Sequence, residues 1–337
     1  MKIIVTGGCG YIGSHTVISL IENGFEIIIV DDLSNSTMET LDRINLITGV
    51  YPVFYNVDLK DTNATFNFFK ASVDVEAIIH FAAYKSVSDS VSKPIEYYKN
   101  NLFSLINVID SAYKNGIKKL IFSSSATVYG QSNKLPINEA CEIKKPFSPY
   151  GNTKKVSEEI IEDFSRAHSD FSAISLRYFN PIGAHESGKI GESPSGIPNN
   201  LMPYITQTAK GIRSELLVYG NDYNTPDGTP IRDYVHVTDV GDAHVASLKR
   251  LINDTQKKQY EIYNIGTGKG YSVLEIIDKF QDISKIKLNY RVVNRRSGDV
   301  PKLYTDTSFA KEKLNWVAKR DLTEMIKSSW NWEQNNI

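Results

Sequence analysis

The amino-acid sequence predicts an α/β fold built on a doubly wound parallel sheet, followed by a smaller mixed α/β part at the C-terminal end. The first half alternates short β-branched runs with longer stretches of helical period, which is the pattern of a parallel sheet covered on both faces. After about residue 180 the chain becomes rich in Gly, Pro, Ser and Asn, and its elements become shorter. We therefore expect domains at 1–180 and 181–337, with the chain crossing between them.

Six apolar runs are predicted to form the strands of the large sheet. They are short and mostly β-branched, and with helical segments between them they are typical of a parallel sheet that is covered on both faces. In chain order they are KIIVTG, FEIIIVDD, YPVFYNVD, EAIIHFAA, KKLIFSSS and FSAISLRYFN.

The clearest helix between these strands lies in KPIEYYKNNLFSLINVIDSAYKNG. Pro94 suits its first turn and Gly116 its end, and apolar residues recur at helical spacing between them. A second helix is expected to begin near Tyr150, and a last one near LTEMIKSSWNWEQ. The segment 183–203 lacks such periodicity, so we expect a long binding loop there.

Composition excludes several classes of function. The 337 residues include 38 Lys and Arg against 39 Asp and Glu, so no overall field attracts nucleic acid or an anionic membrane. Two cysteines supply neither a disulfide framework nor a metal centre, which is typical of a reducing compartment. No leader or membrane-spanning run is evident. We expect a cytoplasmic protein without a metal.

A glycine-rich turn connects the first strand to the first helix. In VTGGCGYIGSH, Gly7 suits the tight turn, Gly10 allows close approach of a pyrophosphate, and Gly13 allows the helix to pack on the sheet. Asp31 follows roughly twenty residues later, at the end of the second strand, where a carboxylate binds ribose hydroxyls. This Rossmann-like context predicts a dinucleotide site. Asp31 and Asp32 would repel a 2′-phosphate, so NAD is favoured over NADP.

Three polar residues form a candidate proton-transfer site. Tyr150 and Lys154 share a helix face, and an ammonium group together with a positive nicotinamide ring would favour the phenolate of the tyrosine. Ser125 ends the fifth strand, at the edge where open α/β sheets bind ligands. A surface pair is the other interpretation of Y-x-x-x-K alone. Together with the dinucleotide turn, the three residues predict hydride transfer assisted by the protein.

These residues resemble the extended short-chain dehydrogenase/reductase family, and within it the UDP-glucose 4-epimerases. The similarity covers nearly the whole chain and includes the segments VTGGCGYIGSHT, IIHFAAYKSV, YYKNN, FSSSATVYG, SPYGNTK, LRYFNPIGAHESG, IPNNLMPY, YGNDYNTPDGTPIRDYVHV, YNIGTG and RRSGDVP. The resemblance implies a homodimer formed through the helices at 94–115 and 150–168. It also implies reversible C4 epimerisation of UDP-glucose and UDP-galactose through a 4-keto intermediate.

The resemblance assigns roles residue by residue. Ser125, Tyr150 and Lys154 are expected to be catalytic. The expected NAD contacts are Gly7, Gly10, Tyr11, Ile12, Gly13, Asp31, Asp32, Asn35, Ser36, Asp58, Leu59, Phe81, Ala82, Ala83, Lys85, Asn100, Ser123, Tyr150, Lys154 and Tyr178. The expected UDP-sugar contacts are Lys85, Ser125, Tyr150, Tyr178, Asn180, Asn200, Leu201, Leu217, Tyr219, Arg232, Arg296, Asp299 and Leu303.

Leu303 stands where the family has a tyrosine in enzymes restricted to glucose and galactose. Because leucine lacks the ring and hydroxyl of tyrosine, we expect a roomier pocket that also accepts UDP-GlcNAc and UDP-GalNAc. Two other functions stay open. A nucleotide-sugar 4,6-dehydratase needs acidic residues after Ser125, where this chain has Ala126, Thr127 and Val128. A non-catalytic NAD-sensing module has no need for Ser125, Tyr150 and Lys154 together.

Overall fold

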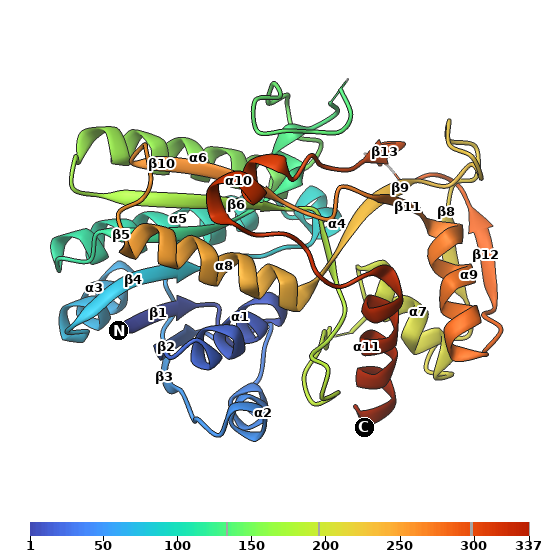
Figure 1. Ribbon diagram of the computed structural model, residues 1–337, viewed down its shortest axis with the longest axis horizontal. Coiled ribbons are helices and arrows are strands. Elements are labelled where there is room, and N and C mark those ends of the chain that lie inside the picture. The colour runs from blue at the N-terminus through green and yellow to red at the C-terminus, as the bar shows by residue number, and fades with distance from the viewer. Residues whose placement is uncertain (133, 195, 297–298, 337) are drawn as a thin grey trace.

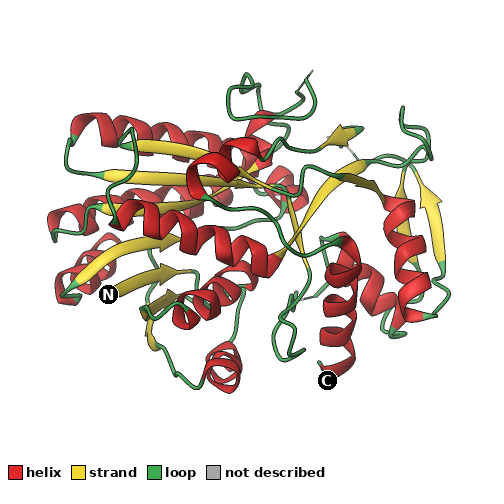
Figure 2. Cartoon of the chain, viewed as in Figure 1, coloured by secondary structure: helices red, strands yellow, loops and turns green. Residues whose placement is uncertain are grey.

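The computed structural model describes residues 1–132, 134–194, 196–296 and 299–336. Ser297 and Gly298 of the RRSGDVP segment lie outside the described residues. A large sheet with helices on both faces occupies one side of the molecule, and a smaller group of helices and short strands occupies the other (Figures 1 and 2). The two groups meet beyond the carboxyl ends of the large sheet's strands.

The large sheet contains seven parallel strands in the order β10-β6-β5-β4-β1-β2-β3. The strands are β1 (Lys2–Thr6), β2 (Glu26–Asp31), β3 (Val53–Asn56), β4 (Val75–His80), β5 (Lys119–Ser125), β6 (Ser172–Tyr178) and β10 (Tyr260–Ile265). The six predicted strands and the doubly wound arrangement are confirmed. The sequence interpretation did not include β10, whose run YEIYNI is interrupted by polar residues and follows the change of composition.

Two helical layers bury the sheet. One face is covered by α1 (Tyr11–Glu22), α2 (Glu39–Thr48), α8 (Val237–Ile252) and α10 (Ser308–Leu314). The other face is covered by α3 (Thr62–Ala71), α5 (Pro94–Lys114) and α6 (Pro149–Ala167), with the short α4 (Val87–Ser92) preceding α5. The helices predicted to start at Pro94 and near Tyr150 are therefore present. The side chain of Ser148 caps α6 by accepting a hydrogen bond from the Gly151 N–H at 3.1 Å.

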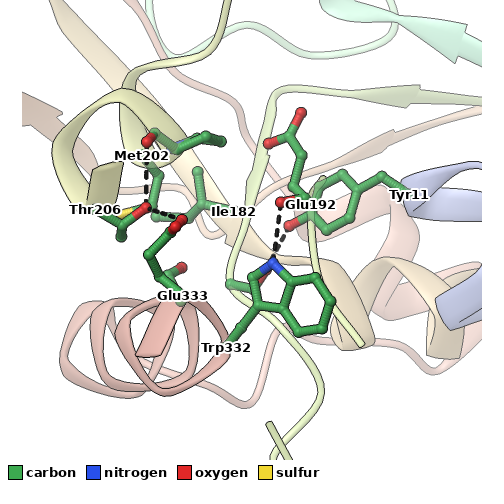
Figure 3. A pocket seen from close by; sticks show the side chains of 10 residues that line it. Tyr11, Ile182, Glu192, Met202, Thr206, Trp332 and Glu333 are labelled. Carbon is green, nitrogen blue, oxygen red and sulfur yellow. Dashed lines mark hydrogen bonds between the residues drawn. The ribbon is translucent and has the colours of Figure 1, made fainter. Parts of the chain in front are cut away.

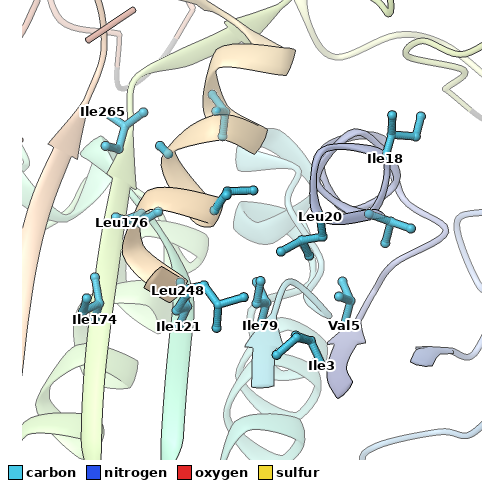
Figure 4. Packing of buried hydrophobic residues seen from close by; sticks show 14 of the residues in the cluster. Ile3, Val5, Ile18, Leu20, Ile79, Ile121, Ile174, Leu176, Leu248 and Ile265 are labelled. Carbon is cyan, nitrogen blue, oxygen red and sulfur yellow. The ribbon is translucent and has the colours of Figure 1, made fainter. Parts of the chain in front are cut away.

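The core under the first layer joins both halves of the chain. Figure 4 shows Val5 of β1 and Leu20 of α1 facing Leu248 of α8, with Leu176 and Ile265 on neighbouring strands. All five side chains are fully buried. Because apolar burial is the main stabilising contribution, α8 and β10 belong energetically to the large sheet although they lie beyond residue 180. The chain thus returns to the first sheet after entering the smaller part.

The smaller part is assembled from short strands around three helices. A four-stranded sheet joins β11 (Gly270–Ser272), β9 (Ile231–His236), β13 (Lys302–Leu303) and β7 (Asn180–Ile182), and a two-stranded sheet joins β8 (Leu216–Tyr219) and β12 (Tyr290–Val293). The helices are α7 (Leu201–Ala209), α9 (Val273–Ser284) and α11 (Leu322–Asn335). A search of the described residues finds no helix with the length and apolar character needed to cross a membrane.

Candidate active site

A cavity of about 1220 Å³ lies between the carboxyl ends of the large sheet and the smaller part. Pockets for a single small molecule usually measure about 300–1,000 Å³, so this space is sufficient for two ligands side by side. Every residue expected to contact NAD or the UDP-sugar lines it, except Leu303. The structure therefore brings together residues from both halves of the chain, as far apart in sequence as Gly7 and Asp299.

The glycine-rich turn forms one wall of this cavity. Gly7 has a φ of +68°, and a Cβ there would lie 2.7 Å from the Ala82 backbone nitrogen, so both conformation and space require glycine. Gly10 is the N-cap of α1, and no side chain caps this helix or places an acid in its first turn. The first N–H groups of α1, which begin at Tyr11, are thus open to an anionic ligand.

Two carboxylates stand beside the turn at the end of β2. Asp31 accepts hydrogen bonds from the backbone N–H groups of Cys9 and Leu33, both at 3.0 Å, and thereby fixes the turn. Burial raises the pKa of Asp31, which those hydrogen bonds oppose.

The sequence interpretation missed Lys60, whose Nζ lies 3.1 Å from Asp58 Oδ1 and 3.9 Å from Asp32 Oδ2. Its only signal was its position two residues after Asp58.

Ser125, Tyr150 and Lys154 converge at the carboxyl ends of the central strands. Lys154 Nζ donates a hydrogen bond to the Ser123 carbonyl at 2.7 Å and lies 6.0 Å from the centre of the Tyr150 ring. Ser125 Oγ accepts a hydrogen bond from Thr127 Oγ1 at 3.0 Å, a contact that the sequence interpretation did not foresee. All four side chains line the cavity. A substrate hydroxyl placed there would have a phenol, a serine hydroxyl and an ammonium group within one small region.

The protonation of this site differs from the sequence expectation. Burial raises the pKa of Tyr150 to about 12, although a hydrogen bond with Ser125 opposes the change. Burial also lowers the pKa of Lys154 to about 7, which the nearby Glu158 carboxylate opposes. Desolvation thus outweighs the attraction between phenolate and ammonium that the spacing suggested. A further positive charge at the site, such as a nicotinamide ring, would shift Tyr150 back towards its phenolate.

A buried ion pair between Glu158 and Arg177 lies one helical turn beyond Lys154. Glu158 receives two hydrogen bonds from Arg177, at 2.9 and 2.6 Å, and one from Ser124 at 2.5 Å. Glu158 and Arg177 are both almost fully inaccessible to solvent. Because the Glu158 carboxylate is already bound by the guanidinium group of Arg177, the Lys154 ammonium group hydrogen-bonds the Ser123 carbonyl and faces the cavity.

Two arginines lie on the opposite wall, in the smaller part. Arg232 in β9 and Arg296 after β12 both contact the Asp299 carboxylate, at 3.3 and 3.2 Å. Their guanidinium groups have the planar geometry that binds diphosphates, and Asp299 holds them together. Tyr219, whose ring centre is 5.8 Å from the Arg296 guanidinium carbon, lines the same wall.

Leu303 lies behind this wall instead of on it. It pairs with Arg232 across β13 and β9 and packs against a buried apolar cluster that includes Phe179 and Tyr129. Phe179 itself lines the cavity. Any effect of Leu303 on the ligand would therefore act through this cluster or through a shift of β13.

Among the described residues, no group of three or more His, Cys, Asp or Glu side chains is arranged to hold a metal ion.

Comparison with known proteins gives a consistent family. The model of the NAD dependent epimerase/dehydratase family matches residues 3–266. The UDP-glucose 4-epimerase of Bacillus subtilis (strain 168) is 48% identical over 337 residues, covering 100% of this chain and 98% of that protein. UDP-glucose 4-epimerase from Bifidobacterium longum, in a crystal structure with NAD+ and UDP, aligns with a TM-score of 0.95 and 43% identity over 100% and 99% of the two chains.

A more distant solved structure is also informative. The UDP-Glc/GlcNAc 4-epimerase from Campylobacter jejuni aligns with a TM-score of 0.84 and 34% identity, covering 99% of both chains. The similarities extend over the large sheet, the cavity and the smaller part alike. The chain belongs to the NAD dependent epimerase/dehydratase family.

Proposed function

We propose that this protein is an NAD-dependent UDP-glucose 4-epimerase, which interconverts UDP-glucose and UDP-galactose. The observation that carries the proposal is the convergence of Ser125, Tyr150 and Lys154 in one cavity with the glycine turn and two arginines. The relatives named above support the same activity. The 4,6-dehydratase alternative gains no support at Ser125, because the neighbouring polar contact comes from the Thr127 hydroxyl and not from a carboxylate.

The cofactor side of the cavity has the hydrogen-bond donors and acceptors that NAD requires. The uncapped N-terminus of α1 suits the pyrophosphate, and the carboxylates of Asp31 and Asp32 suit the ribose hydroxyls. Lys85, Asn100 and the other expected contacts complete this wall. When bound, NAD supplies reversible hydride transfer at C4 of the sugar.

The chain's own residues handle the proton. Tyr150 removes the proton from the sugar O4 hydroxyl as its base and returns it as its acid. Ser125 Oγ hydrogen-bonds the same oxygen while the proton moves. In its protonated form, Lys154 supplies positive charge that stabilises the phenolate of Tyr150.

Binding of the diphosphate by two arginines explains how a single base can exchange a proton on either face of the sugar. Arg232 and Arg296 hold the nucleotide end, and Asn180, Asn200 and Leu217 lie along the same wall. The hexose ring, bound more weakly, can then turn between the two proton transfers and present its other face to Tyr150. Inversion at C4 follows from this difference in binding strength.

An assay without added NAD tests the proposed function. The purified protein is incubated with UDP-galactose, and the sugar nucleotides are separated by chromatography. We expect UDP-glucose to appear, since the net redox change is zero and retained NAD is regenerated in each cycle. A 4-keto-6-deoxy product would instead indicate a dehydratase. No product, with NAD bound, would favour the NAD-sensing module.

The sugar range forms a finer proposal. We infer that the protein also epimerises UDP-GlcNAc and UDP-GalNAc, because Leu303 is smaller than tyrosine and the cluster before it can yield space to a 2-acetamido group. The named activity of the Campylobacter jejuni enzyme makes such a range compatible with this fold.

Replacing Leu303 with tyrosine tests the role of this position. We expect kcat/KM for UDP-GalNAc to fall by roughly tenfold or more, since each extra steric conflict with a substrate costs about 1–3 kcal/mol. The value for UDP-galactose should change by less than about threefold. Leu303→Met, which nearly conserves volume, is the control and should leave both substrates unaffected. Equal losses on both sugars would contradict a steric role.

We also propose that two copies associate through α5 and α6. Ile95, Phe103 and Ile106 are exposed on one side of α5, where single-chain packing leaves them in contact with water. Phe103→Asp should convert a dimer to a monomer in light-scattering measurements, because it would place a charge in an apolar interface. Leu46→Asp, at an exposed leucine in α2, is the matched control. If light scattering gave the wild-type protein the mass of a single chain, the proposal would be contradicted.

A further inference from the structure

Glu192 lies where the cofactor side and the sugar-nucleotide side of the cavity meet. Its side chain is 9% exposed, and a single carboxylate oxygen, Oε1, accepts hydrogen bonds from Lys85 Nζ at 3.0 Å and Asn200 Nδ2 at 2.6 Å. Lys85 follows β4, on the proposed NAD side. Asn200 precedes α7, on the proposed UDP-sugar side. One carboxylate oxygen therefore joins a side chain from each ligand site.

Asn200 binds Glu192 instead of capping its own helix. It is the N-cap residue of α7, and asparagine is favoured there because its side-chain oxygen accepts a backbone N–H of the first turn. Yet Asn200 forms no such cap, and the first turn of α7 contains no acidic residue. In this structure the Asn200 amide therefore binds Glu192, and the first turn of α7 has no side-chain cap.

The backbone of Glu192 is fixed while its side chain faces the cavity. Trp332 Nε1 donates a hydrogen bond to the Glu192 carbonyl at 3.0 Å, and a Cβ at Gly191 would lie 2.6 Å from Cδ1 of the Trp332 ring. Nearby, the Tyr11 hydroxyl donates to the Gly183 carbonyl at 2.6 Å. Figure 3 shows the Glu192 carboxylate pointing away from the Trp332 ring, beside Tyr11. α11 and the glycine turn therefore hold the segment that carries this carboxylate.

We propose that Glu192 is a positioning residue that couples the NAD site to the UDP-sugar site. A nucleotide sugar that takes the Asn200 amide leaves Lys85 as the remaining one of the two donors to Oε1. A carboxylate oxygen shared between two donors binds each less strongly than one serving a single ammonium group, so Lys85 is then held more firmly on the cofactor side. By linkage, each ligand strengthens binding of the other by the same factor.

This inference rests on the proposed function, since that function places Asn200 with the UDP-sugar and Lys85 against NAD as well as the UDP-sugar, and the coupling uses the NAD contact of Lys85. Its test needs binding alone. The NAD-loaded protein is diluted into mild urea with or without saturating UDP, and NAD release is followed by filtration. UDP should slow release from the wild type on the order of tenfold, within the usual range of coupling between sites. In Glu192→Gln, which keeps the shape but removes the charge, the UDP effect should fall below about twofold.

Glu186→Gln is the matched control, because Glu186 is an exposed glutamate in the same segment. It should retain the wild-type UDP effect. Asn200→Ala provides a second variant, in which Lys85 keeps Glu192 to itself. We expect slow NAD release from it without UDP, and little further effect of UDP.

A wild-type UDP effect in Glu192→Gln would overturn the inference. If Glu192→Gln does not retain NAD, Asn200→Ala takes its place in the test. Fast release of NAD from Asn200→Ala without UDP would then overturn the inference. Because the effect is a ratio measured with and without UDP, general destabilisation cancels. Failure of the proposed function is distinguishable, since it appears in the UDP-galactose assay and not in NAD release.

Discussion

Replacing Tyr150 with phenylalanine is expected to lower kcat by a factor on the order of 10²–10⁴, the usual contribution of a general acid or base. Phenylalanine keeps the ring and its packing but removes the hydroxyl that exchanges a proton with the sugar. The NAD content per subunit, read from absorbance after gel filtration, should stay at the wild-type value. A large loss of kcat with NAD retained would assign the defect to proton transfer.

Tyr113→Phe is the matched control for this variant. The Tyr113 hydroxyl hydrogen-bonds Asp170 at 2.9 Å, near the end of α5 and outside the cavity. Its removal should leave both kcat and NAD content unchanged. Near-normal turnover in Tyr150→Phe would exclude Tyr150 as the base, and parallel loss of NAD would indicate a structural role instead.

The first half of the fold could be predicted because its signals are local. Short β-branched or aromatic runs identify β1 to β6, and Pro94 and Gly116 mark the helix between β4 and β5. β10 lacked such a signal, since YEIYNI is stabilised by pairing with β6 and by packing against α10. Its identity depends on tertiary burial, which overrides intrinsic strand preference.

The candidate site was predictable to the extent that its residues form motifs. Gly7, Asp31, Tyr150 and Lys154 occupy recognisable spacings, and the structure brings them to one cavity. The contacts of Glu192 were not predictable, because Lys85 and Glu192 are 107 residues apart in the chain. Desolvation cannot be read from residue spacing, so the burial that raises the pKa of Tyr150 was not predictable.

Lys154 shows how the same burial opposes stability while serving catalysis. Its side chain is 3% exposed, and burial lowers its pKa from an ordinary value near 10.5 to about 7. Below pH 7 the folded protein must therefore hold an ammonium group that the unfolded chain would solvate fully. A pKa difference of this size corresponds to roughly 5 kcal/mol of destabilisation.

Lys154→Met should consequently raise the free energy of unfolding at pH 6 by up to roughly 5 kcal/mol, while lowering kcat on the order of 10²-fold. Between pH 7 and 10.5 the unfolded wild-type chain binds more protons than the folded one, so wild-type stability rises with pH and the gap to the variant closes. Urea unfolding at pH 6, 8 and 10 would measure this convergence.

Lys155→Met is the control, because Lys155 forms a surface pair with Glu159 at 2.8 Å on the same helix. Such a pair contributes about 0–1 kcal/mol and should show no comparable pH dependence. If Lys154→Met were instead less stable than the wild type by the same amount at every pH, the lysine would be a packing residue whose charge costs nothing. A gain in stability that narrows as pH rises, combined with lost turnover, would show that the fold retains a buried charge because the site needs it.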